Sequence, residues 1–203
     1  MKQIESIPEI LRIITEISDV SRAASCLSEN LSLLDPLIGD HSINVARYAV
    51  LIGSQMGFPS DQCSTLLLAA LLHDIGKMLI PIKILYKTAV LNSEEWEIVK
   101  QHPVSGNNLL QPFIQYREAA SIILCHHEFY NGRGYPNGTA GDEIPIFSRI
   151  ISVADAYEAM TSGRPFRRGF SHREAVNRIK EGRGIQFDPD VVSVFVKGLQ
   201  NRP

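Results

Sequence analysis

The sequence LLLAALLHDIGK, residues 66–77, determines how the rest of the chain is organised. Its apolar part, residues 66–72, is long enough for a buried helix and far too short to cross a bilayer. Such a helix delivers an imidazole, His73, and a carboxylate, Asp74, side by side at its C-terminal end. Burying an Asp costs several kcal/mol unless a cation compensates its charge. Asp74 therefore suggests a metal site in which its two oxygens bridge two ions; a surface helix end with two polar residues is the alternative.

The composition describes one well-packed domain with no global signal for a charged partner. The chain has 203 residues, of which 44% are hydrophobic, enough to bury a good core. Its net charge of −2 argues against a nucleic acid polymer or an anionic membrane as partner. Three widely spaced cysteines without a CxxC pair are typical of reduced, mostly buried thiols. With no signal-like leader and no membrane-length apolar stretch, we expect a soluble cytoplasmic protein.

Apolar residues at helical spacing predict an all-α fold. Residues 1–34 show two apolar sets, which we interpret as a helical lead separate from a domain over 35–203. This lead is either simple scaffold or a surface that pairs with a second copy or a sensory partner. Residues 76–92 have little periodicity and are predicted to be a loop, and Pro103 is expected to hold His102 in an extended or turn conformation. Helices are expected over about 40–56, 59–74, 92–102, 103–110, 115–127, 144–160, 171–180 and 190–199.

The histidines supply the main chemical pattern. Five of the six lie at expected helix ends or against buried helices, whereas His172 lies in a polar stretch that favours a solvated position. A single histidine such as His41, in the first turn of its helix, is more often a cap neighbour than a ligand. Asp155 stands in an apolar helix, where an unpaired acid is expensive. The candidate ligands are too many for one tetrahedral ion but suit two ions that share a bridge: His41, His73, Asp74, His102, His126, His127 and Asp155.

Other polar residues gather around the same motifs. Imidazole and carboxylate donors without thiolate suit iron, manganese, nickel, cobalt or zinc, and do not select among them. Lys77 is either the ion-pair partner of Asp74 or a contact for an anionic substrate oxygen. Residues 131–138 (NGRGYPNG) form a turn-rich loop, either a plain surface loop or the rim of an active site. Four arginines between 164 and 173 form a local basic patch, in which Arg168 and Arg173 fit a solvated role.

Six motifs occur in order along the chain: HDIGK (73–77), HP (102–103), HHE (126–128), GYP (134–136), VAD (153–155) and RPFR (164–167). Together they resemble the HD-GYP family. The likeness begins near Asp35 and ends near Pro189, which is about three quarters of the chain. The ordered set is highly specific, whereas an HD pair alone is weak. The resemblance implies an HD-domain helical bundle, in agreement with the helices expected from the periodicity.

The resemblance also implies a bacterial phosphodiesterase that hydrolyses cyclic di-GMP to pGpG and then GMP, with iron or manganese as the first candidate metals. By position, one metal would take His41, His73, Asp74 and Asp155. The other would take Asp74, His102, His126 and His127. Asp74, as the bridge, and Lys77, on a phosphate oxygen, would act in catalysis, and Arg164 and Arg167 would hold phosphate on the far side of the pocket. Tyr135 belongs to the name-giving loop, which the family links to contacts with diguanylate cyclase (GGDEF) domains.

These residue types suit the hydrolysis of a phosphodiester. Two cations would lower the repulsion between negative charges and turn a bridging water into hydroxide near neutral pH. That hydroxide would attack phosphorus in line with the leaving 3′ oxygen, while Lys77, Arg164 and Arg167 balance the equatorial oxygens. Tyr135 would either stack on a guanine or pack the loop.

The chain departs from the family pattern at four positions, one of which, Gly163 in place of a common polar residue before Arg164, weakens no predicted role. Leu37 stands where some members have a Glu for a third metal, so we expect two metals. Asn131 and Glu158 stand where Asp is common, and neither change removes a predicted ligand. Two other functions stay open: a catalytically silent module that binds cyclic dinucleotides, and a phosphohydrolase for another cyclic nucleotide or dinucleotide. The sequence also leaves open a homodimer, the metal, the final product and the regulatory signal.

Overall fold

The computed structural model of the protein describes residues 36–163 and 168–200. The predicted lead over 1–34 and two predicted substrate contacts, Arg164 and Arg167, lie outside the described residues. Within them every regular element is helical, apart from one isolated bridge between Arg183 and Phe187. The predicted all-α class is therefore confirmed.

The helices of the described residues follow the chain in this order: α3 (Pro36–Gln55), α4 (Ser60–Leu72), α5 (Ile82–Leu85), α6 (Ser93–Lys100), α7 (His102–Leu110), α8 (Arg117–Leu124), α9 (Ile146–Thr161), α10 (His172–Glu181) and α11 (Pro189–Gln200). Short 3-10 turns lie between them: η1 (Ile75–Leu79), η2 (Ile114–Tyr116) and η3 (Gly141–Glu143).

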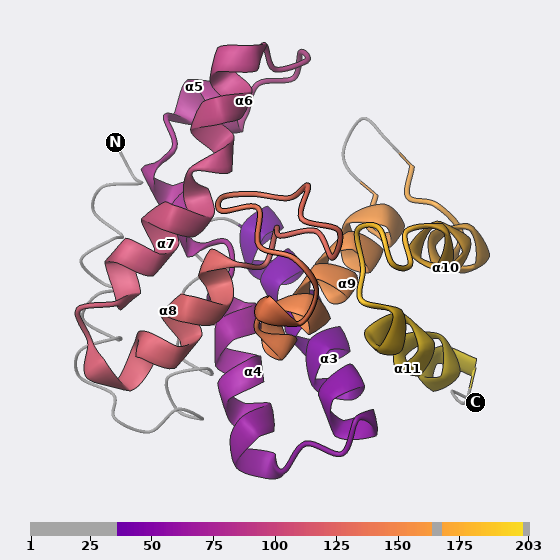
Figure 1. The fold of residues 1–203 in the computed structure, drawn as a ribbon. Helices are drawn as coiled ribbons and strands as arrows, with labels where there is room; N and C mark the ends of the chain where they lie inside the picture. Colours follow the sequence, from indigo (N-terminus) through magenta and orange to yellow (C-terminus); the bar gives the residue numbers. More distant parts are fainter. Residues whose placement is uncertain (1–35, 164–167, 201–203) are drawn as a thin grey trace.

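Helices α3, α4 and α9 form the centre of the bundle, with α7 and α8 on one side and α10 and α11 on the other (Figure 1). Their facing side chains are fully buried, among them Ile52, Leu66, Leu72 and Ile150. Burying a side chain of this size stabilises the fold by roughly 1.5–3 kcal/mol. Because this centre is apolar, any charged group that reaches it needs a compensating partner.

Gly76 brings the end of α4 against α7. A Cβ atom at this position would lie 1.9 Å from the His102 carbonyl oxygen and 2.6 Å from the Gly106 nitrogen, so no other residue fits. This close approach of η1 to α7 sets Asp74 beside His102, although the two are far apart in sequence. The close approach that Gly76 allows thus determines where Asp74 of the HDIGK motif lies.

Several of the predicted helix boundaries are wrong. Residues 76–92 are not a plain loop, because they contain η1 and α5. Helix α4 ends at Leu72 and α8 at Leu124, so the histidines that follow each helix stand in turns. His102 is helical, contrary to the prediction, because Pro103 occupies the first turn of α7, where a missing N–H costs nothing. The predicted capping residue Asn92 does form a capping box, with Glu95.

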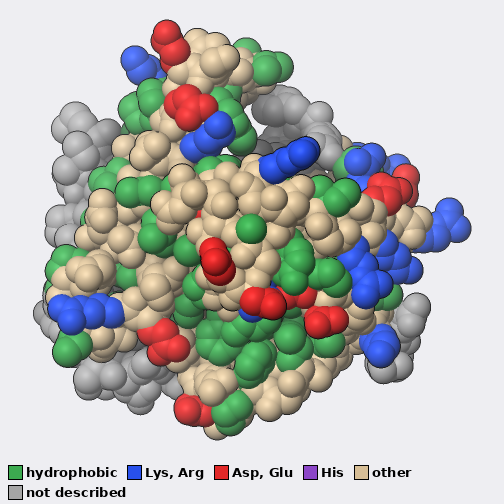
Figure 2. All heavy atoms as spheres, in the orientation of Figure 1, with side chains coloured by type: hydrophobic (Ala, Val, Ile, Leu, Met, Phe, Trp, Pro, Cys, Tyr) green, Lys and Arg blue, Asp and Glu red, His purple; other side chains and the backbone are tan. Residues whose placement is uncertain are grey.

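The part of the predicted basic patch that the structure describes, Arg168 and Arg173, lies on the surface. Lys and Arg side chains gather where α10 lies, on the right of Figure 2, and the exposed members include Arg168, Arg173 and Arg178. Arg168 and Arg173 thus have the solvated positions that were predicted. Cys63 and Cys125 are half-buried rather than fully buried. None of the described helices is both long enough and apolar enough to cross a membrane.

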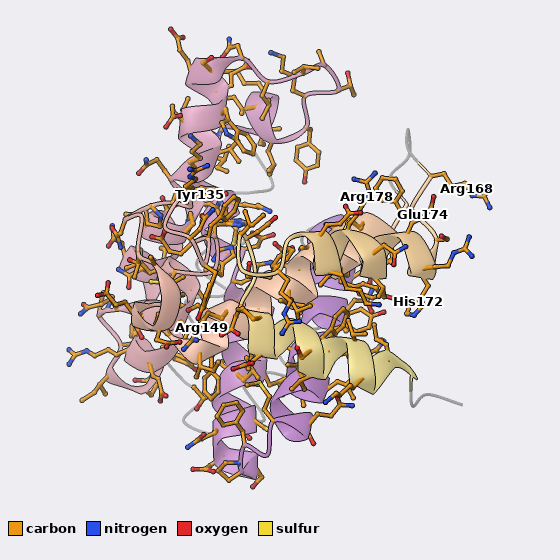
Figure 3. All side chains as sticks on the ribbon, turned by 45° about the vertical axis from the view of Figure 1, so that its right-hand side comes forward. Tyr135, Arg149, Arg168, His172, Glu174 and Arg178 are labelled. Atoms are coloured by element: carbon orange, nitrogen blue, oxygen red, sulfur yellow. The ribbon has the colours of Figure 1, made fainter. Side chains whose placement is uncertain are left out.

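A buried ion pair fastens α11 to α9. One guanidinium nitrogen of Arg149, Nη1, donates to Asp188 Oδ2 and to Asp142 Oδ1, each at 2.7 Å. Asp188 is buried, and its other oxygen accepts the backbone N–H groups of Asp190 and Val191 at the start of α11. Asp188 therefore both caps the start of α11 and forms the ion pair with Arg149. Figure 3 labels Arg149 near the start of α9.

We expect Arg149→Met to lower the free energy of unfolding by about 3–5 kcal/mol, because Asp188 is left buried without its cation. Urea unfolding measures the change. The matched control is Asp142→Asn, which removes the other partner of Arg149; the Asp142 side chain is 86% exposed, so its loss should cost under about 1 kcal/mol. Equal losses in both variants would contradict this account of Asp188.

Candidate metal centre

The seven predicted ligands come from five places in the fold and meet at one end of α4. His41 lies on α3, Asp155 on α9, and the others stand at or just beyond helix ends. Their donor atoms fall into three overlapping groups, and within each group all donor atoms lie within 4.8 Å of one another. The groups are His41, His73 and Asp155; His73, Asp74 and His126; and His102, His126 and His127.

One half of the centre lies between α3, α4 and α9. His41 Nε2 is 3.1 Å from Asp155 Oδ1 and 3.7 Å from Asp74 Oδ2. His73 Nε2 is 3.4 Å from the same Asp74 oxygen and 4.0 Å from Asp155 Oδ1. Four donor atoms from distant parts of the chain thus face a common point.

The other half lies between α7 and the turn after α8. His102 Nε2 is 3.3 Å from Asp74 Oδ1 and 3.3 Å from His126 Nε2. The His127 ring centroid is 4.0 Å from that of His126 and 5.0 Å from that of His102. Asp74 has one oxygen toward each half, which is the arrangement of a bridging carboxylate.

The backbone fixes which nitrogen of three histidine rings is free. His73, His102 and His126 each have Nδ1 next to the carbonyl of the residue three positions earlier, at 2.7, 2.8 and 2.5 Å. Each carbonyl lies in the last turn of a helix, where backbone acceptors are unused. A carbonyl can only accept, so Nδ1 carries the hydrogen and Nε2 of the neutral ring presents a lone pair.

The lone pairs on these Nε2 atoms face one another, and no proton lies between them. Burial lowers the pKa of His102, holds that of His126 well below its ordinary value, and lowers that of His127 to about 3, so all three rings are neutral at pH 7. His102 Nε2 and His126 Nε2 are then two acceptors at 3.3 Å. Among the residues that the structure describes, His73 Nε2 and Asp74 Oδ1 are buried and have no hydrogen-bond partner. Such a set of donors fits a bound cation, because only a cation satisfies all of them.

The two aspartates are ionised. Burial alone would raise the pKa of Asp74, but the neighbouring Lys77 ammonium opposes burial, and that pKa lies well below its ordinary value. Lys77 Nζ donates to Asp74 Oδ2 at 2.5 Å, so the lysine is the ion-pair partner that the sequence allowed. Burial likewise opposes ionisation of Asp155, and its hydrogen bond to His41 outweighs burial and lowers its pKa. His41 in turn has its pKa raised to about 10, since Asp155 and Glu158 outweigh its burial.

The GYP loop borders the centre. The Tyr135 ring lies 4.9 Å from the His127 ring, centroid to centroid, and the Tyr135 N–H donates to the His127 carbonyl at 3.1 Å. Glu128 anchors the loop by accepting the Asn137 N–H at 2.7 Å. Gly134 is required, because a Cβ there would lie 2.2 Å from the Phe129 nitrogen. The loop therefore lies at the rim of the centre, one of the two interpretations that the sequence left open.

His172 lies apart from the other histidines. Figure 3 shows it beside α10, well separated from Tyr135 at the centre's rim. It is exposed, as predicted, but its Nδ1 also lies 2.6 Å from Tyr157 Oη, in a hydrogen bond that the sequence gave no reason to expect.

Two buried acids were not recognised as part of the site. Glu158 accepts a short hydrogen bond from His41 Nδ1, and Glu128 holds the loop. A signal for Glu158 was available: it lies three residues after Asp155, on the same face of an apolar helix. Glu128 follows the double histidine directly, but nothing in the sequence alone indicated that its oxygen reaches residue 137.

Comparison with known proteins finds a matching family model and related proteins of known function. A family model described as HD domain matches residues 25–191. The chain is 37% identical over 163 residues to a cyclic di-GMP phosphodiesterase of Pseudomonas aeruginosa, covering 78% of this chain and 38% of that protein. It is 34% identical over 168 residues to a 3′3′-cGAMP-specific phosphodiesterase of Vibrio cholerae, covering 83% of this chain and 36% of the relative.

A solved structure shares the fold. The HDG"Y"P protein of Bdellovibrio bacteriovorus aligns with a TM-score of 0.71 at 17% identity, covering 98% of this chain and 71% of that one. At this identity the likeness shows the fold alone. The chain spans less than half the length of the two curated relatives named above.

Proposed function

The chain belongs to the HD domain family, and from this premise we propose that it is a metal-dependent phosphodiesterase for a cyclic dinucleotide, with cyclic di-GMP as the first candidate. The observation that carries the proposal is the convergence of unprotonated histidine nitrogens on the ionised Asp74. The relatives named as phosphodiesterases of cyclic di-GMP and of 3′3′-cGAMP support the substrate class.

We propose two metal ions, with Asp74 as the shared ligand. The first would take His41, His73, Asp74 and Asp155, and the second would take Asp74, His102, His126 and His127. Nitrogen and oxygen donors without a thiolate suit iron or manganese, and also nickel, cobalt or zinc. When bound, the ions supply Lewis-acid chemistry and an activated water for attack on phosphorus.

The protein's own residues would orient the substrate around these ions. Lys77 lies next to Asp74 and is half-buried, so its ammonium would turn to a non-bridging phosphate oxygen when a metal replaces it on the carboxylate. Tyr135, at the rim beside His127, would stack on a guanine base. Arg164 and Arg167, known here from the sequence alone, would bind phosphate on the far side. A diguanylate cyclase domain docked on the GYP loop, and a homodimer, are further proposals that rest on the resemblance.

Two alternative functions predict different results in an assay with cyclic dinucleotides. A silent binding module would bind a cyclic dinucleotide without turnover. A phosphodiesterase for another cyclic dinucleotide would prefer that compound over cyclic di-GMP.

The test incubates the metal-loaded protein with cyclic di-GMP, 3′3′-cGAMP or cyclic di-AMP and separates the products by chromatography. We expect hydrolysis of cyclic di-GMP to pGpG or GMP, with the highest kcat/KM among the three. Hydrolysis of a different compound alone would overturn the substrate assignment, and binding without hydrolysis of any would overturn the enzyme.

A further inference from the structure

His41 differs from the other ligand histidines in how its ring is held. His73, His102 and His126 stand at or just beyond helix ends and use carbonyls in the last turn of the preceding helix. His41 lies inside α3, where the carbonyls one turn earlier are engaged in the helix. It therefore needs an acceptor from elsewhere in the fold.

Glu158 is that acceptor. Its Oε2 accepts a short hydrogen bond from His41 Nδ1, which leaves Nε2 directed at Asp155 and Asp74. Its other oxygen accepts from Ser162 Oγ at the end of α9, and Asn44 adds a further hydrogen bond. Glu158 is buried, so the carboxylate is held on several sides and cannot turn away.

We propose that Glu158 is a positioning residue that fixes the tautomer and direction of the His41 ring for one metal ion. The inference rests on the proposed function, because it requires that ion. Carboxylates behind metal-bound histidines act in this way, and their loss typically weakens metal affinity about 10–100-fold. The effect should be confined to the half of the centre that contains His41, since the second half uses backbone carbonyls.

The experiment titrates metal-free protein with Mn²⁺ and follows free ion by electron paramagnetic resonance. We expect wild type to take up two ions per chain. Glu158→Leu should bind one ion with unchanged affinity and the other about 10–100-fold more weakly. Glu158→Asp, which keeps the carboxylate, should restore most of the loss. Ser162→Ala is the matched control, because it removes a different hydrogen bond of Glu158 and leaves the His41 bond in place.

The outcomes distinguish a failure of the role proposed for Glu158 from a failure of the proposed function. Uptake of none of Mn²⁺, Fe²⁺ and Zn²⁺ by wild type would overturn the proposed function itself. Two ions bound equally well by wild type and Glu158→Leu, or an equal loss in Ser162→Ala, would overturn the role of Glu158 alone. Nitrogen-15 NMR of Zn²⁺-loaded wild type tests the same point without a variant: His41 should carry its hydrogen on Nδ1, and a metal-bound Nδ1 would overturn the inference.

Discussion

Asp74→Asn should lower bound metal from two ions to at most one per chain and abolish the proposed phosphodiesterase activity. The substitution keeps the shape of the side chain but takes away the negative charge that both halves of the centre share. One of its oxygens becomes an NH₂ group, which donates where a metal needs an acceptor. We expect at most one ion per chain by elemental analysis, and turnover at the level of the buffer.

The control for this substitution is Asp142→Asn, the same chemical change at an exposed acid outside the centre. It should leave metal content and activity as in wild type. Full activity with two ions in Asp74→Asn would contradict the bridging role. Because removal of a buried charge can alter the fold, circular dichroism and thermal unfolding of both variants accompany the assay.

Lys77→Met gives the second large effect, of a different kind. The ammonium is expected to contact phosphate and not metal, so both ions should remain bound. The loss of one charged donor at the developing negative charge should lower kcat/KM by about 10²–10³-fold, mostly in kcat. Metal analysis and steady-state kinetics on the same sample measure both quantities.

Lys83→Met is the matched control, because Lys83 is an exposed lysine on the neighbouring helix α5. It should behave as wild type. Loss of metal in Lys77→Met would show that Lys77 is a structural partner of Asp74, as the ion pair between the two side chains allows.

The sequence predicted the elements whose signals are local. The capping boxes at Asn92 and Ser171 start α6 and α10 where they were expected. The ends of α4 and α8 were missed, and a close contact with another part of the fold lies just beyond the end of α4. Gly76, pressed against the backbone of α7, makes this contact, and no local pattern records it.

The predicted ligands lie together in the structure. The order of the motifs, and not any single residue, identified them. His41 alone has the sequence surroundings of an ordinary helix residue. The resemblance to the HD-GYP family supplied its role, and the family assignment is confirmed by the HD domain match. Glu158 was noted only as a departure from the pattern. Its partner lies 117 residues away on α3, a pairing that one sequence does not display.

The buried pair of Arg149 with Asp188 also escaped prediction, for the same reason. Each residue by itself resembles an ordinary surface charge in the sequence, and only the packing of α11 on α9 brings the two together. Long-range polar contacts, both in the core and in the metal centre, are thus the features that could not be predicted from the sequence.

Anomalous diffraction from crystals of the metal-loaded protein, recorded at the absorption edge of the bound metal, locates the ions directly. We expect two peaks in each chain: one among His41, His73 and Asp155, and one among His102, His126 and His127, with Asp74 between them. No peak, or a single peak away from Asp74 in fully loaded protein, would contradict the proposed two-metal centre.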